Sequence, residues 1–95
     1  MHSFLPVEEA AALMDAGALV VDVRTPGEWE EGHAAESLLL PLNELPNRFA
    51  ELPKDRALLM VCRSGGRSEQ AAMFLQAMGF ERVFNLGPWQ RNPRH

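Results

Sequence analysis

Residues 57–80 read ALLMVCRSGGRSEQAAMFLQAMGF. They begin with an apolar run that ends at Cys62, and such a short continuous run predicts a strand buried on both faces of a parallel sheet. A polar loop containing Gly65 and Gly66 comes next. From about Ser68 onward, apolar side chains recur at helical spacing until Gly79, a residue type that commonly ends a helix. A buried strand, a glycine-rich loop and a helix in this order predict one unit of an α/β fold.

The rest of the chain alternates in the same way. Apolar runs predict strands at residues 18–24 and 82–86, and residues 37–40 form another short apolar run. Prolines, acidic residues and a capping asparagine mark the starts of the other helical segments. These segments are residues 6–16, one helical turn across residues 28–31, and residues 43–52, with Asn43 as the cap.

This order of elements predicts an α/β domain with a mostly parallel central sheet covered by helices. No repeat or linker interrupts the chain, so residues 1–95 are expected to form a single domain. Residues 87–95, GPWQRNPRH, are expected to be a polar tail, mostly loop and partly disordered. In parallel sheets, sites lie beyond the carboxyl ends of the strands, and here those ends carry Asp22 with Arg24 and Cys62 with Arg63.

Composition narrows the classes of partner. A hydrophobic fraction of 46% and a charged fraction of 23% are typical of globular proteins, and the net charge of -4 argues against nucleic acid or acidic membranes as partners. The N-terminus lacks the basic and apolar regions of a signal peptide, and no apolar run approaches the roughly 20 residues of a membrane span. A lone cysteine is typical of proteins in a reducing compartment. A cytoplasmic location is therefore expected. The histidines (His2, His33 and His95) are scattered, so neither a metal site nor a cofactor is expected.

The loop that follows Cys62 concentrates features that stabilise an anion. Successive backbone N–H groups of a glycine-rich turn can form an anion-binding nest, and the helix that follows adds its positive end. Arg63 and Arg67 add formal positive charge. These features favour a thiolate at Cys62, which would be a nucleophile. The alternative is that Cys62 fills space as a small buried hydrophobe and that Arg63 is a solvated surface charge.

Two segments together resemble the rhodanese domain, specifically the small single-domain sulfurtransferases. VVDVRTPGEWEEGH, residues 20–33, resembles the first block of that family, and VCRSGGRSEQAAMFLQAMGFERVFNL, residues 61–86, resembles its second block. The resemblance implies a central parallel sheet of about five strands flanked by helices. It also implies a reaction in which a cysteine thiolate takes the outer sulfur of a donor such as thiosulfate, giving a persulfide that cyanide or a thiol discharges.

The resemblance assigns roles residue by residue. Cys62 would be the sulfur-carrying nucleophile. The substrate-binding loop whose amides cradle the persulfide would comprise Arg63, Ser64, Gly65, Gly66, Arg67 and Ser68. Arg67 would stabilise that loop and its anion, while Asp22 and Arg24 would shape and support the site. His33 matches a Gly-His pair of the first block, and a hydrogen-bonded structural role is expected for it.

The chain departs from the family pattern in two places. Residues 34–39, AAESLL, replace a segment that commonly contains proline, glycine and asparagine, which affects the local turn. The C-terminal block, which usually has a glycine pair and then a tryptophan and a final helix, is reduced to Gly87-Pro88-Trp89 and a few further residues. That wall of the site could be shortened or completed by another chain.

Several other functions share parts of this signature. Phosphatases and arsenate reductases with a cysteine loop place one residue more between cysteine and arginine, whereas four residues separate Cys62 from Arg67. The tighter loop favours a single sulfur atom over a tetrahedral oxyanion. A persulfide carrier or docking module in a protein sulfur relay would use the same loop. The remaining interpretation is an inert α/β domain. Two arginines near the thiol favour an anionic donor, and hence thiosulfate.

Overall fold

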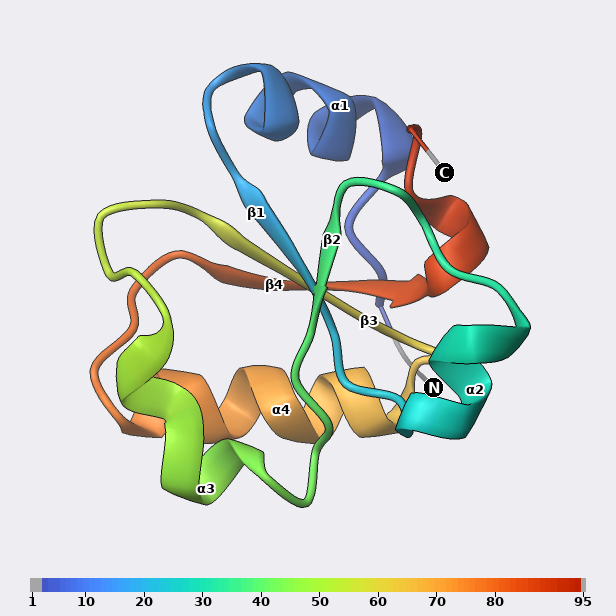
Figure 1. Cartoon of the computed structure of the whole chain (residues 1–95). Coiled ribbons are helices and arrows are strands. Elements are labelled where there is room, and N and C mark those ends of the chain that lie inside the picture. The colour runs from blue at the N-terminus through green and yellow to red at the C-terminus, as the bar shows by residue number, and fades with distance from the viewer. Residues whose placement is uncertain (1–2, 95) are drawn as a thin grey trace.

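The computed structural model describes residues 3–94, in which strands and helices alternate along the chain (Figure 1). The α-helices and strands are α1 (Val7–Asp15), β1 (Leu19–Asp22), α2 (Pro26–Glu31), β2 (Ser37–Leu39), α3 (Leu45–Arg48), β3 (Leu58–Cys62), α4 (Gly66–Ala77) and β4 (Val83–Pro88). Two short 3-10 helices, Phe49–Glu51 and Trp89–Arg91, accompany them.

All strands of the described residues lie in one parallel sheet, in the order β2-β1-β3-β4. The predicted α/β class is therefore confirmed, with four strands in place of the about five that the resemblance implied. The apolar run at residues 37–40 is the edge strand β2. In Figure 1, α1 covers one face of the sheet, and α3 and α4 cover the other.

Side-chain alternation along the strands builds a separate core on each face of the sheet. Val20, Leu59 and Val61 pack toward α1, while Val21, Met60 and Cys62 pack in the cluster that contains residues of α4. Since every residue of β3 is buried, this strand is apolar throughout its length, as the sequence pattern predicts. Cys62 is thereby placed at the end of the central strand, facing the first turn of α4.

The segment 43–52 is less helical than predicted. Helix α3 covers only Leu45–Arg48 before the chain tightens into a 3-10 turn, and Glu44 rather than Asn43 occupies the N-cap position, without a side-chain cap. Pro46 in the first turn suits a helix that starts at Leu45. The prediction of Asn43 as a cap was wrong.

The C-terminal segment is more ordered than predicted. Strand β4 continues past Leu86 to Pro88, and the sheet register shifts by one residue, from Met60 opposite Asn85 to Val61 opposite Gly87. Gly87 has φ +94, a backbone conformation that favours glycine, and it supports this β-bulge. The Gly-Pro pair, which was expected to start a loop, therefore ends a strand, while His95 lies outside the described residues.

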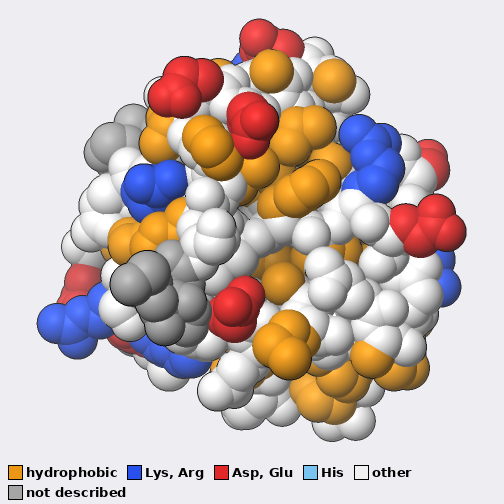
Figure 2. Space-filling model, turned by 180° about the vertical axis from the view of Figure 1, so that it is seen from behind, with side chains coloured by type: hydrophobic (Ala, Val, Ile, Leu, Met, Phe, Trp, Pro, Cys, Tyr) orange, Lys and Arg blue, Asp and Glu red, His pale blue; other side chains and the backbone are white. Residues whose placement is uncertain are grey.

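Other segments cover the outer edge of β4. The N–H of Leu5 donates to the carbonyl oxygen of Asn85 at 2.8 Å, and Arg91 donates to that of Leu86 at 2.8 Å. Such contacts protect an edge strand from pairing with another chain. Figure 2 shows apolar and acidic side chains interspersed over α1, at the top of the view. Within residues 3–94, no helix has the length and apolar character needed to cross a bilayer.

Candidate active site

The carboxyl ends of β1 and β3 lie side by side, because the two strands are parallel neighbours with Asp22 opposite Val61. Cys62, the last residue of β3, is fully buried. A three-residue turn, residues 63–65, then leads into α4 at Gly66, two residues earlier than the predicted start at Ser68. The predicted strand, loop and helix thus bring the cysteine to the N-terminal end of a 12-residue helix.

The sulfur of Cys62 is surrounded by hydrogen-bonding groups of the loop and of the first turn of α4. The backbone N–H of Gly65 donates to Sγ at 2.9 Å, and the hydroxyl oxygen of Ser68 lies 3.3 Å from Sγ. Gly65 adopts φ +105, where glycine is favoured. A Cβ atom at this position would also lie 2.5 Å from the ring of Phe4, so the turn that aims the N–H at the sulfur requires glycine.

These contacts change the acidity of the thiol. Burial raises the pKa of Cys62, but hydrogen bonds from the Ser68 hydroxyl and from the backbone N–H groups of Ser68, Gly65 and Ser64 lower it by more. The pKa therefore lies below the ordinary value for cysteine. The arrangement favours a thiolate at Cys62, which is the nucleophilic form of the side chain.

Arg67 forms an ion pair that connects the loop to α2. Its guanidinium group donates to both carboxylate oxygens of Glu28, at 2.7 and 2.9 Å. This contact, together with a backbone hydrogen bond from Thr25, lowers the pKa of Glu28 to about 2, so Glu28 stays charged at ordinary pH. The pKa of Arg67 is raised, first by the hydrogen bond to Glu28 and also by the charge of Cys62.

Glu28 was not predicted as a site residue, although one sequence signal could have located it. Thr25 and Glu28 have the spacing of a capping box: the Thr25 hydroxyl accepts from the Glu28 N–H, and the Glu28 carboxylate accepts from the Thr25 N–H. Helix α2 therefore starts at Pro26, before the predicted turn at residues 28–31. This cap fixes the carboxylate of Glu28 at the start of the helix, within reach of Arg67.

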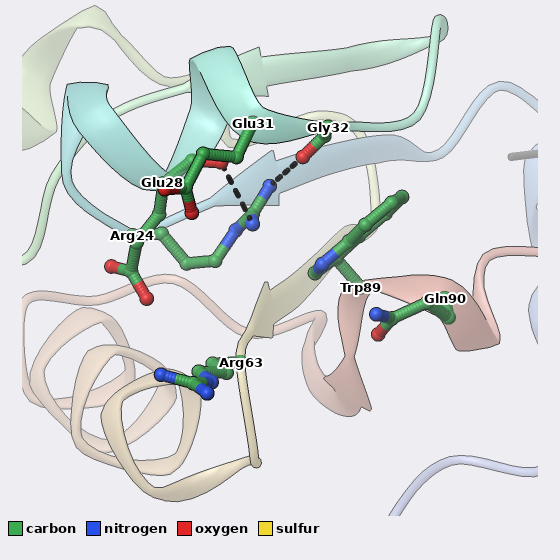
Figure 3. A pocket seen from close by; sticks show the side chains of 7 residues that line it. All are labelled: Arg24, Glu28, Glu31, Gly32, Arg63, Trp89 and Gln90. Atoms are coloured by element: carbon green, nitrogen blue, oxygen red, sulfur yellow. Dashed lines mark hydrogen bonds between the residues drawn. The ribbon is translucent and has the colours of Figure 1, made fainter.

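Asp22 and Arg24 form a buried ion pair beside the loop. Nη2 of Arg24 lies 2.8 Å from Oδ2 of Asp22, and the two residues are exposed by only 4% and 0%, respectively. Arg24 also donates to the carbonyl oxygens of Glu28, at 3.3 Å, and Gly32, at 2.8 Å (Figure 3). Its guanidinium lies 4.9 Å from the centre of the Trp89 ring. The pair thus ties the end of β1 to both ends of α2 and to the C-terminal segment.

His33 is an exposed residue that follows the C-terminal end of α2. Its Nδ1 lies 2.7 Å from the carbonyl oxygen of Trp29, and the His33 and Trp29 rings are stacked with centroids 3.6 Å apart. These contacts fit the structural role expected for His33. The side chain of Ser64 is exposed, and Ser64 acts on the sulfur through its backbone N–H, whose hydrogen bond lowers the pKa of Cys62.

A cavity of about 230 Å³ opens above the loop, between α2 and the 3-10 helix Trp89–Arg91 (Figure 3). Its lining residues are Arg24, Glu28, Glu31, Gly32, Arg63, Trp89 and Gln90. Among the described residues, Arg63 forms no ion pair, so its charge is available in the cavity. Trp89 and Gln90, from the C-terminal segment that departs from the family pattern, contribute to the wall of this cavity.

The chain is similar to known proteins in sequence and in fold. The sequence model of the rhodanese-like domain matches residues 6–87. A protein from Allochromatium vinosum named sulfurtransferase is 47% identical over 68 residues, which are 72% of this chain and 64% of that protein, just under two thirds of its length. The thiosulfate sulfurtransferase GlpE of Stutzerimonas stutzeri is 37% identical over 82 residues, which are 86% of this chain and 75% of that protein. The crystal structure of a rhodanese-related protein from Thermoplasma volcanium has a TM-score of 0.82 at 27% identity, covering 96% of this chain and 90% of that one.

Proposed function

The chain belongs to the rhodanese-like domain family, and from this premise we propose that it is a sulfurtransferase that moves sulfane sulfur from thiosulfate to a thiophilic acceptor through a persulfide on Cys62. The observation that carries the proposal is the environment of the sulfur. Sγ of Cys62 accepts from the Gly65 N–H at 2.9 Å and contacts the Ser68 hydroxyl, in a loop that has four residues between Cys62 and Arg67. These donors favour the thiolate that the first step requires.

The reaction is balanced without an external oxidant. The thiolate of Cys62 attacks the outer sulfur of thiosulfate, so a new S–S bond forms at the cysteine. The S–S bond of thiosulfate breaks, and its electron pair leaves with sulfite. Cyanide, or the thiolate of an acceptor, then attacks the outer sulfur of the persulfide. That S–S bond breaks, the acceptor departs with the sulfur, and the Cys62 thiolate is restored.

The two arginines of the loop would have different roles. Arg63 lines the cavity and forms no ion pair within residues 3–94, so it is the cation available to the oxygens of an anionic donor. The charge of Arg67 is shared with Glu28, at 2.7 Å, and also acts on the Cys62 thiolate. Arg63 would therefore bind the donor, and Arg67 would stabilise the reactive sulfur and hold α2 against the loop.

One experiment distinguishes a sulfurtransferase from a phosphatase. Purified protein is expected to convert thiosulfate and cyanide to thiocyanate and sulfite, with two-step kinetics in which the donor loads the protein before the acceptor reacts. The same sample is expected to leave para-nitrophenyl phosphate intact. Phosphate hydrolysis without thiocyanate formation would overturn the proposal. Loading by a cysteine desulfurase but not by thiosulfate would instead assign the chain to a protein sulfur relay.

Removing the charge of Arg67 is expected to slow loading. Arg67→Ala should reduce kcat/KM for thiosulfate by about tenfold to a hundredfold, because a hydrogen-bonded charge next to the thiolate is lost and the Glu28 carboxylate is left unpaired. The matched control is Arg48→Ala, which removes an arginine paired with Glu44 and Glu51 far from the loop and should leave kcat/KM unchanged. An unchanged kcat/KM in a folded Arg67→Ala protein would limit the role of Arg67 to the fold.

A further inference from the structure

Asn85 is a buried polar residue of β4 that faces the cysteine loop. Along β4, Val83 packs in the cluster that contains residues of α4, while Phe84 and Leu86 pack with the cluster that contains residues of α1. Since side chains alternate along a strand, Asn85 points to the same face as Val83. It is 8% exposed and lies beside the first turn of α4. A buried amide in this position needs hydrogen-bond partners.

Each end of the Asn85 amide has partners at the site. Nδ2 donates to the carbonyl oxygen of Gly65 at 3.2 Å, while Oδ1 accepts from the N–H of Gly87 at 3.0 Å. The hydroxyl of Ser68 lies 2.7 Å from the same Oδ1. The donor at Gly87 and the acceptor at Gly65 fix the orientation of the amide. The β-bulge of β4 brings the Gly87 N–H back onto the side chain of Asn85.

The hydroxyl of Ser68 has one proton and three acceptors within reach. Its oxygen lies 2.7 Å from Oδ1 of Asn85, 3.1 Å from the carbonyl oxygen of Gly65 and 3.3 Å from Sγ of Cys62. A hydroxyl donates one hydrogen bond at a time. When Cys62 is a thiol, its proton can go to the Ser68 oxygen while Ser68 donates to Asn85. When Cys62 is a thiolate, the Ser68 proton is needed at the sulfur.

Asn85 lowers the free-energy cost of moving the Ser68 hydrogen bond to the sulfur. After Ser68 turns to the sulfur, Oδ1 of Asn85 still accepts from Gly87, and the carbonyl oxygen of Gly65 still accepts from Nδ2 of Asn85. Neither acceptor is then left buried without a donor, which would carry a large penalty. Without the amide, the Gly65 carbonyl would keep the backbone N–H of Glu69 as a donor, at 3.1 Å, and the Ser68 hydroxyl, at 3.1 Å, would be its other donor. The Gly65 carbonyl would then compete with the sulfur for the Ser68 proton.

We propose that Asn85 is a positioning residue for sulfur transfer: it holds the Gly65 turn against Cys62 and frees the Ser68 hydroxyl to donate to the thiolate. The inference deepens the proposed function, since it concerns the same sulfur. It can be tested separately, because it is measured through the reactivity of the thiol and not through turnover. The charged groups on the elements around Cys62 are Asp22 with Arg24 at the end of β1, Arg63 in the loop, Arg67 of α4 with Glu28 of α2, and Glu69 in the first turn of α4.

The test uses the pH dependence of Cys62 alkylation by iodoacetamide, which reports on this residue alone because the chain has one cysteine. The variant Asn85→Leu keeps a side chain of similar volume and removes every hydrogen bond of the amide. It is expected to raise the pKa of the thiol by about one unit or more, so that alkylation on the acid side slows about tenfold. Ser68→Ala should shift the pKa in the same direction.

The matched control is Gln76→Leu, which removes another amide contact between α4 and β4, from Nε2 of Gln76 to the carbonyl oxygen of Val83 at 3.4 Å. It should leave the alkylation profile unchanged. If Asn85→Leu does not fold, the near-isosteric Asn85→Asp is measured instead, and it too should raise the pKa. An unchanged profile in a folded Asn85 variant would overturn the proposal. Loss of folding in both variants would overturn it too, by assigning Asn85 to the fold alone.

Discussion

Replacing Cys62 by serine is expected to abolish the formation of thiocyanate from thiosulfate and cyanide. The proposed reaction passes through an S–S bond at this residue, and a serine hydroxyl is neither ionised at neutral pH nor able to form that bond. Turnover should fall by at least about a thousandfold, to the rate without protein. The chain has no other cysteine that could substitute.

The fold should survive this change. Serine is close to cysteine in size, and at position 62 its hydroxyl oxygen can accept from the Gly65 N–H that now donates to the sulfur. The circular dichroism spectrum and the midpoint of thermal unfolding should therefore stay near those of the unsubstituted protein. Thiocyanate formation by a folded Cys62→Ser variant would show that another group carries the sulfur, and would contradict the proposed role of Cys62.

Replacing Asp22 by alanine is expected to be the most damaging change to stability outside the apolar core. The variant leaves the guanidinium of Arg24 buried without its carboxylate, and breaking a buried pair in this way costs about 3–5 kcal/mol. Small domains have a total stability of about 5–15 kcal/mol, so the midpoint of thermal unfolding should fall by at least about 10 °C. Chemical denaturation of the two proteins measures the difference.

Two controls separate the buried charge from the loss of any ion pair. Glu44→Ala removes an exposed partner of Arg48 and should change the midpoint little, because water already screens that pair. The double variant Asp22→Leu/Arg24→Met removes both buried charges and should recover part of the loss. A midpoint for Asp22→Ala as high as that of Glu44→Ala would contradict the account of the pair.

The strands were predictable because they are buried on both faces. In β1 and β3, every position after Leu19 is buried, so the runs at residues 18–21 and 57–62 are apolar without alternation. The end of β4 was not predictable in the same way. Gly87 and Pro88 are typical of turns, and only the register shift opposite Val61 accommodates them in a strand.

The cysteine loop was predictable because its residues are contiguous, whereas the contacts that surround it were not. Glu28 and Arg67 are 39 positions apart, and Ser68 and Asn85 are 17 apart. No local pattern links such residues, since their proximity depends on how α2 and β4 are placed around the end of β3. Trp89 was noted for its resemblance to a family position, but its place in the cavity follows from the length of β4.

The location of the transferred sulfur tests the central claim most directly. The intact mass of the protein is measured after incubation with thiosulfate and again after cyanide, for the unsubstituted chain and for Cys62→Ser. The account predicts a gain of one sulfur atom that cyanide removes, with no gain in the variant. An unchanged mass after thiosulfate, or an equal gain in Cys62→Ser, would contradict it.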